Sequence, residues 1–287
     1  MDDGILNLTD VTGQKLTLQL PMRRVVSLVP SVTESVFGLG CEDALVGRTR
    51  YCIAPDPEVR KIAKFGGTKD PDVPGIVALK PDLVLANREE NRKVDIDAMR
   101  EAGLAVYVDE PTTVNEGLAM INLLGRIFQH EDEAGQIVAI GARTLQEIEA
   151  HVAERDALNQ LRASPREDAR PRVIAFIWHD PWMVAGAHTY IGDMIEVLGG
   201  RHVYKRSKER YFRVDPVEVA AMKPDILLFP DEPYAFTEKD IDFWRQNFEQ
   251  TPAVADKRLR PCSGQDLCWY GTRIPAALLR LQPVLAW

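Results

Sequence analysis

The chain has 287 residues, of which 45% are hydrophobic and 27% charged, and its 43 acidic and 35 basic side chains give a net charge of −8. This composition can bury a core and excludes a generally disordered chain, and the length favours two domains. An acidic chain is a poor binder of nucleic acid; its densest basic segment, residues 205–210, is interrupted by Glu209 and is interpreted as a solvated loop or a local anionic contact.

The first predicted element is a buried strand over residues 24–29, Arg-Val-Val-Ser-Leu-Val, a short β-branched run that Pro30 ends. The next four residues, Ser-Val-Thr-Glu, match a capping box at a helix start, so we expect Glu34 to accept the backbone N–H of Ser31 rather than contact a ligand. Residues 76–85 predict a helix end, a Lys-Pro-Asp turn and a second buried strand, because proline stops a helix and aspartate favours a turn.

The second half of the chain repeats this order. Residues 172–177, Arg-Val-Ile-Ala-Phe-Ile, again begin with Arg-Val, and residues 219–228 match 76–85 with the same Lys-Pro-Asp turn. An offset of about half the chain indicates a duplication into two α/β lobes rather than a short-period repeat. Strands that are apolar throughout predict mostly parallel sheets with helices on both faces.

A long helix is predicted over residues 131–161, because apolar residues recur there at helical spacing and no proline interrupts them. At about 1.5 Å per residue, it would extend about 45 Å. The predicted fold class is therefore α/β: two similar α/β lobes, each a mostly parallel sheet flanked by helices, joined by one long crossover helix. The predicted domains are residues 1–130, 131–162 and 163–287, and such a connector should make a stiff, clam-like monomer that closes little on binding.

No stretch of the sequence reaches about 18 consecutive apolar residues, so no transmembrane helix is expected. The first residues carry neither the basic nor the apolar region of a signal peptide; as written, the chain is expected in the cytoplasm, and in the periplasm if a leader was removed. The cysteines Cys41, Cys52, Cys262 and Cys268 fit no zinc or redox spacing. Four free thiols are expected, although Cys262 and Cys268 could pair in an oxidising compartment.

Three motifs give the sequence a specific resemblance. They are Arg-Val-Val-Ser-Leu-Val-Pro-Ser-x-Thr-Glu at residues 24–34, Val-Gly-Arg-Thr-Arg-Tyr at 46–51 and the Lys-Pro-Asp segment at 76–85. Together they resemble the helical-backbone (class III) substrate-binding proteins of ABC importers for cobalamin, ferric siderophores and haem, and the cobalamin-binding branch most closely. The resemblance extends over about residues 9–281. It implies binding rather than catalysis, with an ABC permease as a partner.

The resemblance also implies a ligand cleft between the lobes, lined by aromatic rings that pack on a flat macrocycle. The candidate ligand-binding residues are Tyr51, Thr68, Arg88, Trp178, His179, Trp182, Tyr211, Asp266, Trp269, Tyr270 and Arg273. The charged ones would meet amide side chains of a corrinoid, although Arg273 could equally pair with an aspartate. Thr68 is a departure, because the cobalamin-binding branch has tryptophan at that position.

Acidic surface residues that meet arginines of a permease are a further implication of the resemblance. The family's glutamate positions, seven residues before the proline of each Lys-Pro-Asp turn, hold Pro74 and Val217 here. Acids nearby, Asp72 in one lobe and Asp215 or Glu218 in the other, are therefore the candidate docking residues. Docking through shifted contacts and a stand-alone intracellular corrinoid-binding protein both stay open.

His179, directly after the first strand of the second lobe, is a candidate axial ligand of haem iron or cobalt, with Tyr51 facing it in a haem protein. Its alternative role is a hydrogen bond to Asp180 or to a loop carbonyl. A bare-metal receptor is disfavoured, because no histidine occurs before residue 130. No nucleophile-elbow, phosphate-loop or zinc-protease motif is present, so an enzyme such as a hydrolase is the least favoured function.

The sequence thus predicts a monomeric binding protein without an intrinsic cofactor. It would capture a small metal complex, and a corrinoid such as cobalamin is favoured over haem and a ferric siderophore. Capture would be followed either by delivery to an importer or by intracellular retention.

Overall fold

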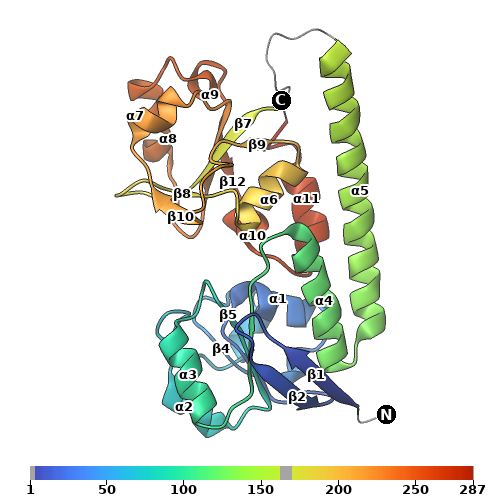
Figure 1. Cartoon of the computed structure of the whole chain (residues 1–287). Helices are drawn as coiled ribbons and strands as arrows, with labels where there is room; N and C mark the ends of the chain where they lie inside the picture. Colours follow the sequence, from blue (N-terminus) through green and yellow to red (C-terminus); the bar gives the residue numbers. More distant parts are fainter. Residues whose placement is uncertain (1–3, 162–169, 287) are drawn as a thin grey trace. The chain divides into compact units, whose positions relative to one another are not determined.

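The computed structural model describes residues 4–161 and 170–286, which form two compact units (Figure 1). The first unit comprises the chain up to Pro111, the segment Glu116–Ala139 and the short returning segment Tyr270–Arg273; the remaining segments belong to the second unit. Both units are built on a mainly parallel sheet flanked by helices, and one long helix continues from the first unit into the second. The predicted fold class is therefore confirmed.

A four-stranded parallel sheet is the centre of the first unit, in the order β4-β3-β5-β6. Its strands are β3 (Val25–Ser27), β4 (Leu45–Arg48), β5 (Leu83–Asn87) and β6 (Val106–Asp109), and its helices are α1 (Pro30–Gly38), α2 (Val73–Leu79), α3 (Lys93–Glu101) and α4 (Val114–Phe128). In Figure 1, α2 and α3 cover one face of this sheet and α1 and α4 the other. Every residue of β3 and β5 is buried, because both faces are covered.

Shorter elements complete the first unit. An antiparallel hairpin of β1 (Ile5–Thr9) and β2 (Lys15–Gln19) precedes the parallel sheet, and 3-10 turns occur at Glu42–Ala44 and Glu58–Lys61. The hairpin strands alternate buried and exposed side chains, as expected when only one face of a strand pair packs on the unit.

The second unit contains a six-stranded sheet in the order β10-β8-β7-β11-β12, with β9 paired to β7. Its strands are β7 (Arg172–Trp178), β8 (Met183–Ala185), β9 (Arg201–His202), β10 (Tyr211–Arg213), β11 (Ile226–Pro230) and β12 (Leu259–Cys262). Its helices are α6 (Tyr190–Val197), α7 (Pro216–Ala221), α8 (Glu238–Asn247), α9 (Pro252–Ala255), α10 (Gly264–Cys268) and α11 (Ile274–Leu281). Strands β7, β9, β11 and β12 run parallel; β8 pairs with β7 in the antiparallel direction, and β10 pairs antiparallel with β8 at the edge of the sheet.

An aromatic cluster forms the core on one face of the second sheet. Phe176 of β7 lies 5.3 Å from both Phe229 of β11 and Trp244 of α8, measured between ring centroids. Trp182 joins them at 4.8 Å from Phe176. Such large buried rings give this unit a rigid frame on which the neighbouring loops are held.

The two Lys-Pro-Asp segments fold in the same way. Each lysine adopts the left-handed conformation, with φ of 49° at Lys80 and 50° at Lys223. Each aspartate then closes the sheet, since Asp82 Oδ2 accepts the backbone N–H of Arg24 at 2.9 Å and Asp225 Oδ2 accepts that of Arg172 at 2.9 Å. The repeated motif is therefore a structural turn that ties a helix end to the start of β3 in the first unit and of β7 in the second.

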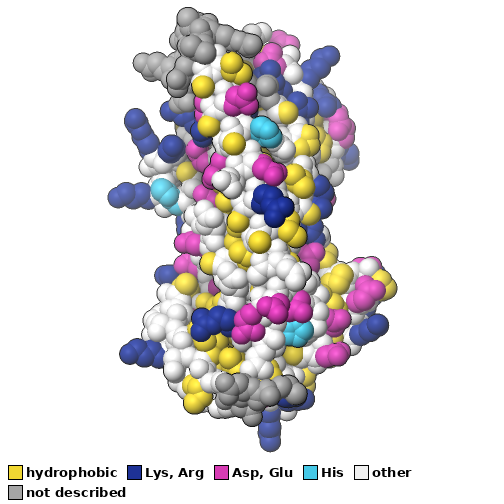
Figure 2. Space-filling view, turned by 90° about the vertical axis from the view of Figure 1, so that its right-hand side faces the viewer, with side chains coloured by type: hydrophobic (Ala, Val, Ile, Leu, Met, Phe, Trp, Pro, Cys, Tyr) yellow, Lys and Arg dark blue, Asp and Glu magenta, His cyan; other side chains and the backbone are white. Residues whose placement is uncertain are grey.

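The long helix α5 (Glu131–Leu161) has the predicted bounds. Figure 2, which shows the side of the molecule where α5 lies, has acidic, basic and apolar side chains interspersed over that face. Among residues 4–161 and 170–286, no helix is both long enough and apolar enough to span a membrane.

The predicted capping box at Ser31 is wrong. Helix α1 begins at Pro30 with Val29 as its N-cap, and no side chain caps it. Proline is suited to the first helical position because it has no N–H and a helical φ, so the helix begins before Ser31. The Glu34 carboxylate instead pairs with Arg273, with 2.8 Å between Oε2 and Nε.

Candidate functional site

The carboxyl edge of the second sheet presents exposed aromatic rings. Strands β7, β11 and β12 are parallel, so their carboxyl ends lie along one edge, which is where open α/β sheets bind ligands. Trp178, the last residue of β7, is 43% exposed. Its ring makes an edge-to-face contact with Tyr234 from the loop after β11, with centroids 5.6 Å apart. This pair offers a rigid apolar surface next to solvent.

His179 follows Trp178 and is held from two sides. Its Nδ1 lies 2.5 Å from Oδ1 of Asp240, and its ring stacks on Trp182 with centroids 4.3 Å apart. Burial alone would raise the pKa of Asp240, but the hydrogen bonds from the backbone and hydroxyl of Thr237 and from His179 outweigh it and lower that pKa. Asp240 is therefore a carboxylate that accepts the Nδ1–H of His179, which leaves Nε2 as the ring nitrogen not engaged by Asp240. The partner is Asp240, 61 residues along the chain, and not the neighbouring Asp180.

Three other predicted ligand-binding residues of the second unit lie in the interior. Trp182 is only 7% exposed and belongs to the aromatic core, so it supports His179 from behind. The carboxylate of buried Asp266 is held by Arg280 at 2.6 Å through both oxygens. Trp269 is buried at the end of α10. Tyr211, by contrast, is 38% exposed at the start of the edge strand β10.

The carboxyl edge of the first sheet presents Tyr51, which is 52% exposed. The guanidinium of Arg50 lies 5.0 Å from the centre of its ring, and Arg50 is itself paired with Asp70 at 2.8 Å. A cation over one face of the tyrosine restricts the orientation of its ring. The loop beneath it is ordered by Arg48, which is buried.

A buried polar network lies behind this edge. Asn87 Nδ2 donates to Asp109 Oδ1 at 2.9 Å and to the Tyr270 hydroxyl at 3.0 Å, and that hydroxyl donates to the same Asp109 oxygen at 3.0 Å. Burial raises the pKa of Asp109 to about 7, although the bonds from Asn87 and Tyr270 oppose the shift. Burial and the charge of Asp109 likewise raise the pKa of Tyr270 well above its ordinary value. Tyr270 thus anchors the segment Tyr270–Arg273 to the first sheet.

Three more predicted residues of the first unit have protein partners. The Thr68 carbonyl accepts a hydrogen bond from Asn91 Nδ2 at 3.0 Å. Arg88 is exposed and lies 3.3 Å from Glu110. Arg273 pairs with Glu34 rather than with an aspartate. The structure therefore places Thr68 and Arg88 near the sheet edge and Arg273 beside α1, with its charge already balanced.

The candidate docking acids occupy equivalent positions in the two units. Asp72 is the N-cap of α2 and accepts the Gly75 N–H at 3.1 Å, and Asp215 is the N-cap of α7 and accepts the Val217 N–H at 2.7 Å. Glu218 is exposed in the first turn of α7. Each aspartate therefore has a structural role, and a role in docking stays a prediction.

Metal-ligating groups are dispersed. Within the described residues, no group of three or more histidine, cysteine or acidic side chains could hold a metal ion. Cys41, Cys52, Cys262 and Cys268 are free thiols in the structure.

Comparison with known proteins identifies the family. The family model described as periplasmic binding protein matches residues 25–262, which is most of the chain. The chain belongs to the periplasmic binding protein family. Members of this family bind substrates for ABC transport, which confirms the prediction of a binding protein rather than an enzyme.

Relatives of this periplasmic binding protein include named ligand binders. It is 25% identical over 205 residues to a vitamin B12-binding protein of Yersinia pestis, which covers 71% of this chain and 68% of the relative. The crystal structure of the periplasmic vitamin B12 binding protein of Vibrio cholerae matches with a TM-score of 0.78, 19% identity and coverage of 92% of this chain and 97% of that chain. A periplasmic heme-binding protein in complex with two hemes matches with a TM-score of 0.75, 26% identity and coverage of 92% and 99%.

Tyr234, at the carboxyl edge of the second sheet, was not among the residues predicted from the sequence. The residue follows β11 in the segment Asp231-Glu232-Pro233-Tyr234 and packs on both Trp178 and His179. The available signal was its place directly after a buried strand, because the loops at carboxyl ends of parallel strands carry ligands. Nothing in the sequence near Asp240 indicated its contact with His179, because Asp240 lies within α8 and only the tertiary fold brings the two side chains together.

Proposed function

We propose that this protein captures a corrinoid, such as cobalamin, for an ABC importer. The observation that carries the proposal is the set of exposed aromatic rings at the carboxyl edges of the two sheets, above all Trp178 with its partner Tyr234. A corrinoid is broad and largely apolar on its faces, so rigid rings gain contact area with it at a small cost in conformational entropy. The two relatives named as vitamin B12-binding proteins support the same ligand class.

Within this proposal the residues have different roles. Trp178, Tyr51 and Tyr211 are the proposed ligand contacts, because their rings are exposed. Trp182, Tyr270 and Asp266 are proposed to position the contacts, because each is buried and packed or hydrogen-bonded within its own unit. Thr68 and Arg88 are proposed to meet the polar periphery of the ligand, since both lie beside loops at the edge of the first sheet.

Calorimetric titration with cyanocobalamin tests the proposal. We expect saturable one-to-one binding, and we expect Trp178→Ala to weaken it at least about tenfold, because a large aromatic contact dominates such interfaces. Leu279→Ala, at an exposed apolar residue of α11 in the same unit, is the matched control and should leave the affinity unchanged. Failure of the wild-type protein to bind, or equal weakening by both variants, would contradict the proposal.

Haem is a second candidate ligand, favoured by the geometry of His179. Histidines that ligate metals commonly donate their other ring N–H to a carboxylate, and His179 does so to Asp240. The relative crystallised with two hemes supports this alternative.

We expect haemin to give a Soret shift in the wild-type protein if haem is the ligand, and His179→Ala to abolish that shift. His179→Asn, which keeps a polar group beside Asp240, is the control for folding and should also lose the shift. An unchanged Soret band in both variants would exclude His179 as the ligand.

A further inference from the structure

A recess of about 620 Å³ lies at the amino ends of the strands in the second unit. Arg172 and Arg201, which line it, are the first residues of the parallel strands β7 and β9. Trp178 is at the other end of β7, and a seven-residue strand separates its ends by about 20 Å. The recess is therefore distinct from the carboxyl edge that presents the exposed aromatic rings.

Positive charge dominates the lining of this recess. Glu196 is its one lining carboxylate, against five cations: Arg170, Arg172, Arg201, Lys205 and Arg206. Two of these cations have carboxylate partners: Arg170 lies 2.8 Å from Asp156, outside the lining, and Lys205 lies 3.9 Å from Glu196 of the lining. In the part of the chain that the structure describes, no carboxylate forms an ion pair with Arg172 or Arg206. Two guanidinium groups thus face the recess with hydrogen-bond donors to spare.

A recess in the first unit is also lined by cations, but all of them are paired with carboxylates. It has a volume of about 470 Å³ and three cationic lining residues. Each of the three has a carboxylate partner: Arg88 with Glu110 at 3.3 Å, Arg100 with Asp10 at 2.6 Å, and Lys93 with Asp97. The recess in the second unit differs from it, because no described carboxylate forms an ion pair with its Arg172 or Arg206.

The floor of the recess in the second unit is fixed by His202. Its Nε2 donates to the Ala185 carbonyl at 3.0 Å, its Nδ1 accepts the Tyr204 N–H at 3.1 Å, and its backbone N–H donates to Glu196 at 3.0 Å. Burial lowers the pKa of His202 to about 4, so the ring stays neutral in this arrangement. The segment that carries Tyr204, Lys205 and Arg206 is thus held in place before any ligand binds.

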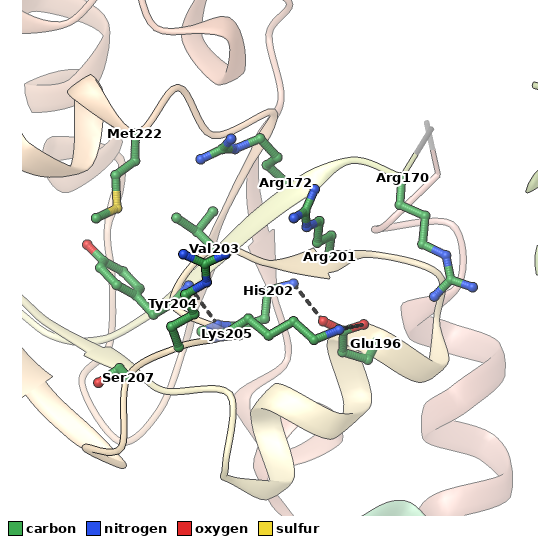
Figure 3. A pocket seen from close by; sticks show the side chains of 11 residues that line it. Arg170, Arg172, Glu196, Arg201, His202, Val203, Tyr204, Lys205, Ser207 and Met222 are labelled. Atoms are coloured by element: carbon green, nitrogen blue, oxygen red, sulfur yellow. Dashed lines mark hydrogen bonds and ion pairs between the residues drawn. The ribbon is translucent and has the colours of Figure 1, made fainter. Parts of the chain in front are cut away.

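One wall of the recess is apolar. Figure 3 shows Tyr204 and Met222 along one side with Arg172 beside them, and Arg170 on the opposite side. Burial and the charge of Glu218 raise the pKa of Tyr204 to about 12, so its phenol remains a hydrogen-bond donor. A ligand that fits this recess combines an anionic group with a small apolar portion.

We propose that this recess binds a phosphate-bearing anion, with Arg172 and Arg206 on the phosphate oxygens and Tyr204 and Met222 against the rest of the ligand. The planar guanidinium matches two oxygens of a phosphate at once, so two arginines can satisfy a tetrahedral anion better than lysines can. A free phosphate compound and the headgroup of an anionic lipid share this chemistry.

Titration with inorganic pyrophosphate at low ionic strength tests the free-anion source, and binding to phosphatidylglycerol-containing vesicles tests the lipid source. We expect saturable one-to-one binding by the wild-type protein in one arm. The double variant Arg172→Gln, Arg206→Gln should weaken it at least about tenfold, because both charged hydrogen-bond donors are lost. The control Arg92→Gln, Lys93→Gln removes the same charge from exposed residues of the first unit and should change the affinity by no more than about twofold.

Each outcome decides the question. Binding of vesicles alone supports the site with a lipid source, and binding of pyrophosphate supports it with a free-phosphate source. No binding in either arm, or equal weakening by the control variant, overturns the proposal. Unfolding midpoints in urea check that each double variant is folded, and its affinity for cyanocobalamin should equal that of the wild type, which keeps this test separate from the proposed ligand.

Discussion

Replacing Arg48 by methionine is expected to lower the free energy of unfolding by about 3 kcal/mol. Arg48 is only 3% exposed, and its guanidinium donates to three backbone carbonyls, those of Val59 at 2.8 Å, Cys52 at 2.9 Å and Thr49 at 3.1 Å. Burial lowers the pKa of Arg48, while the nearby Cys52 opposes the shift. Methionine would fill much of the same volume but leave all three carbonyls without their donor, at a cost of about 1 kcal/mol or more for each.

The effect should reach ligand binding, because these carbonyls define the loop that presents Tyr51. Urea unfolding would measure the stability change, and a cyanocobalamin titration would measure the accompanying loss of affinity. Arg48→Lys should have an intermediate effect, since an ammonium group cannot extend three donors in the plane of a guanidinium.

Arg60→Met is the matched control, in the same loop. Arg60 is largely exposed and pairs with Asp56 on the surface, so its loss should change the stability by less than about 1 kcal/mol. Wild-type stability of Arg48→Met would show that water replaces the guanidinium and that the loop does not depend on it.

The elements of the fold could be predicted because each has a local cause. The Lys-Pro-Asp turn recurs because its lysine takes a left-handed conformation and its aspartate bonds the backbone at the start of β3 or β7. The bounds of α5 follow from an uninterrupted helical pattern after Gln129, whose φ of 58° separates it from α4. The start of α1 was misplaced because two local signals compete there, and proline at the first helical position prevails over the serine that follows it.

Only part of the candidate site could be predicted from the sequence. The resemblance indicated Trp178 and Tyr51, and the structure places both exposed at the carboxyl ends of parallel strands, where open α/β sheets bind ligands. The resemblance could not separate Trp178 from Trp182, because the chain reverses at Asp180, with φ of 58°, and returns the second ring to the core. The partners of the candidate side chains could not be predicted from the sequence either. Glu34 and Arg273 are 239 residues apart in sequence, and only tertiary packing brings them together.

Replacing Asp109 by asparagine is expected to raise the free energy of unfolding above neutral pH. The folded-state pKa of about 7 is raised above its ordinary value of 3.8, mainly by burial. At a pH between 3.8 and about 7, Asp109 holds a proton in the folded protein, whereas the same carboxyl has released it in the unfolded chain. Stability from this group is therefore fully present below about pH 4, declines as the pH rises, and is lost above about pH 7.

The magnitude follows from the shift, since each pKa unit corresponds to about 1.4 kcal/mol. A buried carboxylate at Asp109 should thus cost up to about 4 kcal/mol at pH 8. Asparagine carries no charge and keeps an oxygen in place of Oδ1, which can still accept from Asn87 and Tyr270. The variant should match the wild type near pH 4 and exceed its stability by about 2–4 kcal/mol at pH 8.

Urea unfolding of both proteins across this pH range gives the test, with Asp97→Asn as the control because Asp97 pairs with Lys93 on the surface of α3. The difference between wild type and Asp109→Asn should grow from pH 4 to pH 7 and then level off, whereas Asp97→Asn should follow the wild type throughout. A constant difference would mean that Asp109 does not titrate in this range.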